Sequence, residues 1–114
     1  MPQVKQIESF EDWHEMLEAS ESKPVLLMKH STRCPVSANA WNEFHKFLKT
    51  PEHEKVHAAF VKVIESRPAS MQIAEDTGVP HESPQAILLI NRKAVWSATH
   101  YDITANALQQ SIQQ

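Results

Sequence analysis

Three short, continuous apolar runs alternate with amphipathic segments, and this alternation limits the fold more than any other feature of the sequence. The apolar runs cover residues 24–28, 58–64 and 85–90. Runs of this length, bounded by polar residues, are typical of strands that are buried on both faces of a sheet. The segments at 10–21, 35–49 and 66–78 place apolar residues at helical spacing. The pattern therefore predicts strands and helices in alternation.

The remainder of the chain extends this order. Residues 91–93 form a hairpin-sized connection to a strand at 94–98, and Thr104 is expected to cap a terminal helix. Residues 4–7 allow a short edge strand. The order predicts an α/β fold of three layers, with helices on both faces of a central mixed sheet of four or five strands. A length of 114 residues suits one domain over 1–114.

One octapeptide, His-Ser-Thr-Arg-Cys-Pro-Val-Ser at residues 30–37, joins the first apolar run to the second amphipathic segment and contains the only cysteine. Pro35 is suited to the first position of a helix, so Cys34 is expected at the N-cap. The free backbone N–H groups of Val36 and Ser37 are expected to point at its sulfur. Together with the positive end of the helix dipole, they favour the thiolate over the thiol. We interpret the octapeptide as the reactive turn of a thiol-disulfide enzyme.

Polar side chains on both sides of Cys34 are candidates for substrate binding. Ligands of open α/β sheets bind beyond the carboxyl ends of the parallel strands, and Cys34 follows such an end. We expect Lys29, Thr32 and Arg33 to flank this groove, where the cations would pair with carboxylates of a small thiol. Ser37, one helical turn after Cys34, is a candidate hydrogen-bond donor to the sulfur. A single cysteine excludes both a disulfide within the chain and a two-cysteine cycle, which leaves a monothiol route.

Composition excludes several other classes of function. A formal net charge of -3, from 11 basic and 14 acidic residues, gives no general attraction to nucleic acid or anionic lipid. The sequence has neither an apolar run of about 18 residues nor a secretory signal, so we expect a cytoplasmic protein with no membrane partner. We also expect a monomer. Seven histidines invite a metal interpretation, but a zinc site needs three or four converging ligands and only one thiolate exists, so no metal site is expected. A Cys-His hydrolase, with His30 or His81 beside Cys34, lacks an oxyanion-hole signature.

At this point the residues resemble known families. The order of elements resembles the thioredoxin fold over essentially the whole chain. The motif Cys34-Pro35-Val36-Ser37 is similar to the Cys-Pro-x-Cys of glutaredoxins, with serine in place of the second cysteine. The wider string at 29–37, followed by Ala-Asn-Ala-Trp at 38–41, resembles the monothiol bacilliredoxins, the YtxJ-like family of the bacillithiol system.

This resemblance implies an activity and a set of site residues. The activity is removal of bacillithiol, acting as co-substrate, from S-thiolated proteins by Cys34, with Pro35 in the motif and no tightly bound cofactor. Ser83 and Pro84 would face Cys34, joined by a cis peptide bond, and the Ser83 backbone would hold the substrate. Pro80 competes with Pro84 for this role.

Two alternatives remain open. The chemistry of the chain does not separate bacillithiol from glutathione or coenzyme A, and a non-catalytic thioredoxin-like binding or adaptor module is the alternative function. An iron-sulfur cluster shared with an external thiol is disfavoured, because Pro35 replaces the glycine that is usual in cluster-binding glutaredoxins.

Overall fold

The computed structural model describes residues 3–113, and its strands form one mixed sheet in the order β1-β3-β2-β4-β5. Strands β1 and β2 pair with β3 in parallel, whereas β4 is antiparallel to both β2 and β5. The sheet confirms the mixed topology and includes the predicted edge strand. The strand bounds are β1 (Val4–Gln6), β2 (Val25–His30), β3 (His57–Lys62), β4 (Gln85–Ile90) and β5 (Lys93–Thr99).

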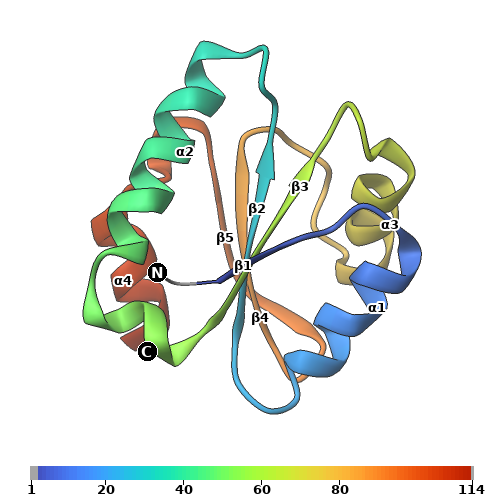
Figure 1. Cartoon of the computed structure of the whole chain (residues 1–114), viewed down its shortest axis with the longest axis horizontal. Coiled ribbons are helices and arrows are strands. Elements are labelled where there is room, and N and C mark those ends of the chain that lie inside the picture. The colour runs from blue at the N-terminus through green and yellow to red at the C-terminus, as the bar shows by residue number, and fades with distance from the viewer. Residues whose placement is uncertain (1–2, 114) are drawn as a thin grey trace.

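Two helices cover each face of the sheet (Figure 1). Helices α2 (Pro35–Leu48) and α4 (Ala105–Gln113) lie on one face, and α1 (Phe10–Ala19) and α3 (Arg67–Thr77) lie on the other. Successive side chains of a strand point to opposite faces, so β2 serves both cores. Leu26 and Met28 pack on the α2/α4 side, and Val25 and Leu27 on the α1/α3 side. This confirms the three layers expected from the sequence.

Local signals in the sequence set most of the helix ends. The Ser9 side chain accepts a hydrogen bond from the first turn of α1, and the Thr104 hydroxyl does the same for α4. Gly78 follows α3 with a φ of 73°, in the left-handed region where glycine has no steric penalty. Helix α1 ends at Ala19, two residues before the predicted end.

The β4–β5 hairpin is the predicted connection, and it is docked onto the end of α1. Asn91 and Arg92 have φ values of 52° and 71°, which is the pattern of a two-residue type I′ turn. The N–H of Asn91 donates to the Ser20 carbonyl, and that of Arg92 donates to the Ser20 hydroxyl, both over 2.8 Å. Arg92 also pairs with Glu21. The turn is therefore held by tertiary contacts as well as by its own backbone.

Two short 3₁₀ turns complete the described chain. Turn η1 (Pro51–Lys55) lies between α2 and β3, and it starts where the Thr50 carbonyl accepts the N–H of His53. Turn η2 (His100–Asp102) follows β5. Within residues 3–113, no helix is both long enough and apolar enough to cross a membrane.

Candidate functional site

Cys34 is the N-cap of α2, as predicted, and lies four residues beyond the carboxyl end of β2. Its backbone is extended, with φ −114° and ψ 123°, and its carbonyl accepts the N–H of Ala38 over 3.0 Å. The side chain is half-buried and makes no capping hydrogen bond within the described chain. The expected contacts from the N–H groups of Val36 and Ser37 are thus not made. Cys34 is therefore partly exposed, and its side chain accepts no capping hydrogen bond from the described part of α2.

Ser37 does not make the bond to the Cys34 sulfur that the sequence suggested. Its side chain is fully buried, and its hydroxyl oxygen accepts the N–H of Ser31 over 2.9 Å. The same oxygen lies 2.8 Å from Nδ1 of His30. These contacts join the end of β2 to the first turn of α2. Ser37 therefore closes the octapeptide loop around Cys34.

His30 is held on the α2 side of the sheet. It is buried, and its ring stacks on Trp41 with 4.4 Å between centroids. Burial lowers the pKa of His30, the charges of Lys62 and His45 lower it further, and Glu65 opposes them. The His30 ring and the Ser37 hydroxyl therefore form a buried side-chain hydrogen bond that links β2 to the first turn of α2.

Lys29 departs most from expectation. We expected a cation beside the groove, but the Lys29 side chain is 0% exposed. It shares the face of Val25 and Leu27 and points beneath α3, where Nζ lies 3.0 Å from Nδ1 of His81. Burial lowers the pKa of Lys29 to about 8. Because the strand is covered on both faces, Lys29 has no surface with which to contact a ligand in the groove.

The other predicted residues of the reactive turn lie at the surface. Thr32, Arg33 and Pro35 are exposed, between the end of β2 and the start of α2. Arg33 is therefore the accessible cation of this turn, in place of the expected pair of cations.

The loop at 79–84 reaches the same end of the sheet as Cys34. The Ser83–Pro84 peptide bond is cis, as the resemblance implied, and Pro80 has no cis bond. Pro84 is buried and its carbonyl accepts the N–H of His100 over 3.1 Å. The next residue, Gln85, pairs with Lys29 near the end of β2, which places the loop near the β2–α2 turn (Figure 1). The Ser83 hydroxyl is buried and has no hydrogen-bond partner among the described residues.

Two further residues contribute to this end of the sheet: His81, which the sequence suggested only as a partner of Cys34 in a hydrolase, and Gln85, which it did not single out. His81 accepts the hydrogen bond of Lys29, and Gln85 donates from Nε2 to the Pro80 carbonyl over 3.0 Å. A signal for Gln85 exists, since it is a polar residue at the start of an apolar run. No group of three or more His, Cys, Asp or Glu side chains is arranged to hold a metal ion within residues 3–113.

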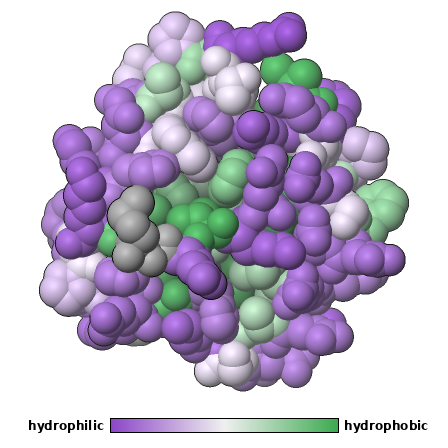
Figure 2. Space-filling view, viewed as in Figure 1, coloured by the Kyte–Doolittle hydropathy of each residue, from purple (hydrophilic) through white to green (hydrophobic). Residues whose placement is uncertain are grey.

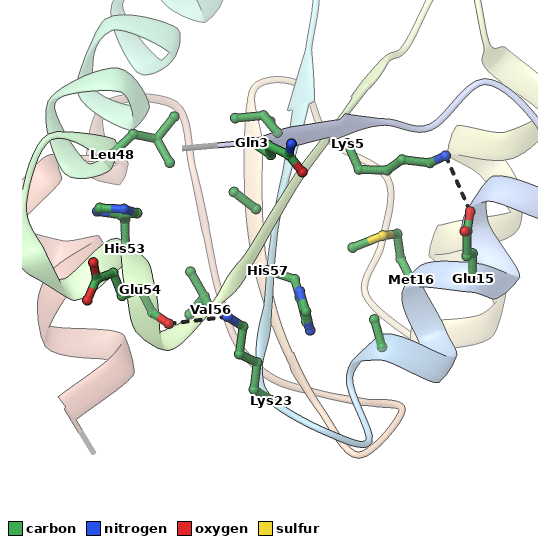
Figure 3. A pocket seen from close by; sticks show the side chains of 13 residues that line it. Gln3, Lys5, Glu15, Met16, Lys23, Leu48, His53, Glu54, Val56 and His57 are labelled. Carbon is green, nitrogen blue, oxygen red and sulfur yellow. Dashed lines mark hydrogen bonds and ion pairs between the residues drawn. The ribbon is translucent and has the colours of Figure 1, made fainter. Parts of the chain in front are cut away.

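A separate hollow lies at the opposite end of the sheet (Figure 3). Its volume is about 780 Å³, and it is lined by the starts of β1 and β3 together with α1 and η1. The same face in Figure 2 shows apolar side chains at the bottom of a hollow with a hydrophilic rim. Lys23 on this rim donates to the Glu54 carbonyl over 3.2 Å, and Lys5 pairs with Glu15. The hollow is lined by residues distant from Cys34, so it is not part of the candidate site.

Comparison with known families decides which kind of thioredoxin-like protein this is. A family model described as "Monothiol bacilliredoxin BrxC" matches residues 5–108. The chain belongs to the monothiol bacilliredoxin family. This confirms the resemblance found in the octapeptide.

Solved structures similar to this bacilliredoxin confirm the fold. A candidate oxidoreductase with a thioredoxin fold is 35% identical, with a TM-score of 0.83, over 97% of this chain and 94% of the other. Thioredoxin from Malassezia sympodialis is 23% identical, with a TM-score of 0.78, over 100% and 91% of the two chains. Thioredoxin from Fasciola hepatica is 14% identical, with a TM-score of 0.75, over 96% of each chain. The family and the thioredoxin fold together support a thiol oxidoreductase role for this bacilliredoxin.

Proposed function

We propose that this bacilliredoxin removes bacillithiol from protein mixed disulfides through Cys34. The observation that carries the proposal is a half-buried sulfur at the N-terminus of α2, in a chain with one cysteine. Because Cys34 is only half-buried, a disulfide of a substrate can approach it at the start of α2. Membership of the bacilliredoxin family supports bacillithiol as the small thiol.

The reaction is a thiol-disulfide exchange in two steps. The Cys34 thiolate attacks the bacillithiol sulfur of the mixed disulfide, a new S–S bond forms on Cys34, and the protein substrate leaves as a thiolate. A second bacillithiol thiolate then attacks the bacillithiol sulfur bound to Cys34. This step releases oxidised bacillithiol and restores the Cys34 thiolate. The second bacillithiol is therefore the reductant of the reaction, and no further reductant is needed.

An external thiol is required because the chain cannot resolve the intermediate itself. Ser37 occupies the place of a second cysteine, and a hydroxyl does not attack a disulfide. Its oxygen is also buried and bonded to Ser31 and His30. The chain therefore keeps the small thiol on Cys34 until another thiol, or another redox protein, removes it.

The exposed residues around Cys34 form the proposed substrate-binding surface. Arg33 would pair with a carboxylate of the small thiol, and Thr32 and Pro35 would line the approach to the sulfur. The Ser83 backbone, next to the cis bond to Pro84, would hold the extended protein substrate by main-chain hydrogen bonds. We expect this surface to work in a monomer, in a cytoplasm that keeps small thiols reduced.

The test is de-thiolation of one model protein that carries bacillithiol, glutathione or coenzyme A on the same cysteine. Released protein thiol and the adduct on Cys34 are measured by mass spectrometry. We expect the bacillithiol adduct to be removed fastest and a Cys34→Ala variant to remove none. Removal by Cys34→Ala would refute the proposal, and faster removal of glutathione or coenzyme A would reassign the small thiol.

The same protein distinguishes the enzyme from a non-catalytic adaptor. The rate of Cys34 alkylation is followed from pH 4 to 10. Rapid alkylation at pH 7 would favour the enzyme, since the thiolate is the nucleophile in thiol-disulfide exchange. Slow alkylation that rises only near the pH at which a free thiol ionises would favour the adaptor.

A further inference from the structure

The proposed function leaves the buried Lys29 side chain without a role. Placing an ammonium group in the interior costs free energy unless partners replace its water. None of the ion pairs found within residues 3–113 includes Lys29. Its hydrogen-bond partner is a histidine in the loop that contains the cis bond. A buried lysine that is not neutralised by a carboxylate calls for a functional explanation.

The geometry of this contact fixes the state of His81. An ammonium group only donates hydrogen bonds, so Nδ1 of His81 accepts and the ring proton is on Nε2. The Ser70 hydroxyl of α3 lies 3.5 Å from the same Nδ1. His81 is therefore held from below by β2 and from the side by α3, in its neutral form.

Gln85 holds the residue next to His81 in the same way. Lys29 and Gln85 are directly paired across β2 and β4, so their side chains lie on the same face of the sheet. Gln85, 2% exposed, donates to the Pro80 carbonyl, while Lys29 binds His81. At its other end the loop is fixed by the bond from His100 to the Pro84 carbonyl. Two buried side chains and one backbone bond thus fix the loop at both ends.

We propose that Lys29 is a positioning residue that holds the 79–84 loop in the shape that receives a mixed disulfide beside Cys34. The inference rests on the proposed function, because the loop acts there through the Ser83 backbone. Lys29 does not touch the substrate and acts through His81. Its loss lets the loop move, which weakens substrate binding while the attack by the Cys34 sulfur is unchanged.

The contact also depends on pH in a definite direction. Burial lowers the pKa of His81, the charges of Lys29 in β2 and Arg67 in α3 lower it further, and Glu82 in the loop opposes them. When His81 is protonated, Nδ1 no longer accepts and two cations face each other. The loop is therefore held at neutral pH and released as the pH falls through the His81 pKa, which lies below its ordinary value of 6.5.

The experiment compares Lys29→Met with Lys23→Met in the full chain. Methionine keeps the length of the side chain and removes the donor, and Lys23 lies on the hollow at the other end of the sheet. His81→Asn keeps an acceptor near the position of Nδ1, whereas His81→Leu removes it. The readouts are the tautomer and titration of His81 by NMR on histidine-labelled protein, the KM and kcat for a bacillithiolated peptide, and the Cys34 alkylation rate.

For Lys29→Met we expect the His81 pKa to rise toward 6.5 and the Nε2–H tautomer preference to weaken. KM should rise about threefold to tenfold, as for the loss of one hydrogen bond, with kcat and alkylation unchanged. His81→Leu should reproduce the change in KM, His81→Asn should restore most of the binding, and Lys23→Met should behave as the wild type.

The inference is overturned if His81 keeps its tautomer and titration in Lys29→Met, or if KM rises equally in Lys23→Met. A fall in kcat and alkylation rate without a change in KM would also overturn it, since Lys29 would then act on the sulfur. If the wild-type protein removes no small thiol, the proposed function fails. The NMR result still decides whether Lys29 holds His81, and exchange of any mixed-disulfide peptide with Cys34 replaces KM as the binding readout.

Discussion

The two ends of the sheet differ in how their polar groups are used. At the end where the parallel strands begin, the hollow of Figure 3 has a volume of about 780 Å³. The lysines that line it are paired: Lys5 with Asp12 and Glu15, and Lys23 with the Glu54 carbonyl. At the end where those strands finish, the Cys34 side chain makes no capping bond within residues 3–113, and Lys29 and His30 near the end of β2 form buried side-chain hydrogen bonds. The difference teaches that cavity volume does not locate the chemistry here. Under the proposed function, the half-buried Cys34 thiol at the start of α2 does.

The strongest test of this difference between the two ends of the sheet removes the Cys34 thiol. Cys34→Ser should reduce de-thiolation to the rate of uncatalysed exchange, because no other thiol exists in the chain. The free energy of unfolding should change by only about 0.5 kcal/mol, since the side chain is half-buried and makes no capping bond. Turnover assays and urea denaturation measure the two effects. Residual turnover in Cys34→Ser would show that the active site is not at the carboxyl end of β2.

A second test measures how the buried Lys29 side chain affects the free energy of unfolding. The folded pKa of Lys29 is about 8, against 10.5 in the unfolded chain, so the unfolded chain binds more protons between these values. The contribution of Lys29 to the free energy of unfolding therefore rises as the pH increases from about 8 to 10.5. At pH 7, Lys29→Met should be more stable than the wild type by a few kcal/mol, at about 1.4 kcal/mol for each pKa unit.

The difference in the free energy of unfolding between Lys29→Met and the wild type should shrink toward pH 10.5. Urea denaturation of both proteins at pH 7 and pH 10 measures this difference. A difference that stays constant with pH would show that Lys29 is not desolvated. Lys23→Met is the matched control, because the Lys23 side chain lies on the rim of the open hollow.

A third test removes the hydroxyl that closes the reactive loop. Ser37→Ala leaves the N–H of Ser31 and Nδ1 of His30 without their partner, which costs about 1–3 kcal/mol of the free energy of unfolding. Ser111→Ala is the matched control, because that buried hydroxyl donates only to the Leu108 carbonyl of its own helix. Urea denaturation compares the two variants. Equal losses would mean that Ser37 has no special part in the loop.

A smaller effect is expected from the exposed cation of the turn. Arg33→Gln should raise KM for a thiol that carries carboxylates by about twofold to fivefold, in line with the value of an exposed charge pair. The effect should decrease at high salt, where exposed charges are screened. Lys49→Gln, which removes an exposed charge at the other end of α2, is the control. An unchanged KM in Arg33→Gln would remove Arg33 from the binding surface.

The smallest effect is expected in the hollow itself. His57→Gln changes a residue that lines it, and kcat and KM should stay within about twofold of the wild type. The pKa of His57 is lowered by burial and by Lys23, so the wild type should lose stability as the pH falls below 6.5, where the unfolded chain binds more protons. The His57→Gln variant should lose less stability than the wild type over the same fall in pH. A large loss of activity in His57→Gln would bring the hollow into the function.

Much of the fold was predictable because its signals are local. The apolar run at 85–90 became a strand with the predicted bounds. Ser9 and Thr104 cap helices through their hydroxyl groups, and Gly78 ends α3 because it adopts a positive φ without a steric penalty. The short turn η1 (Pro51–Lys55) was not predicted, because it lies in a polar stretch without regularly spaced apolar residues and is held by backbone hydrogen bonds.

The position of Cys34 was also predictable, whereas the roles of its neighbours were not. A cysteine between a buried strand and Pro35 is an N-cap on local grounds alone. Strand alternation placed Lys29 on the same face as Val25 and Leu27, but its partner depends on a loop that is 52 residues away. Ser37 likewise bonds to Ser31 and His30 only because β2 and α2 meet at this distance.

By itself, the sequence determined the order of elements, the position of the single cysteine at a helix start and the monothiol route. These features depend on residue type and on spacing over a few positions of the chain. Only the tertiary structure decided that Lys29 points inward to His81 and that Gln85 lies beside Lys29. It also decided that Ser37 bonds to Ser31 in the 30–37 loop rather than to the Cys34 sulfur. The physical reason is that strand register and helix packing choose hydrogen-bond partners among groups far apart in the chain. Local patterns carry no information about that choice.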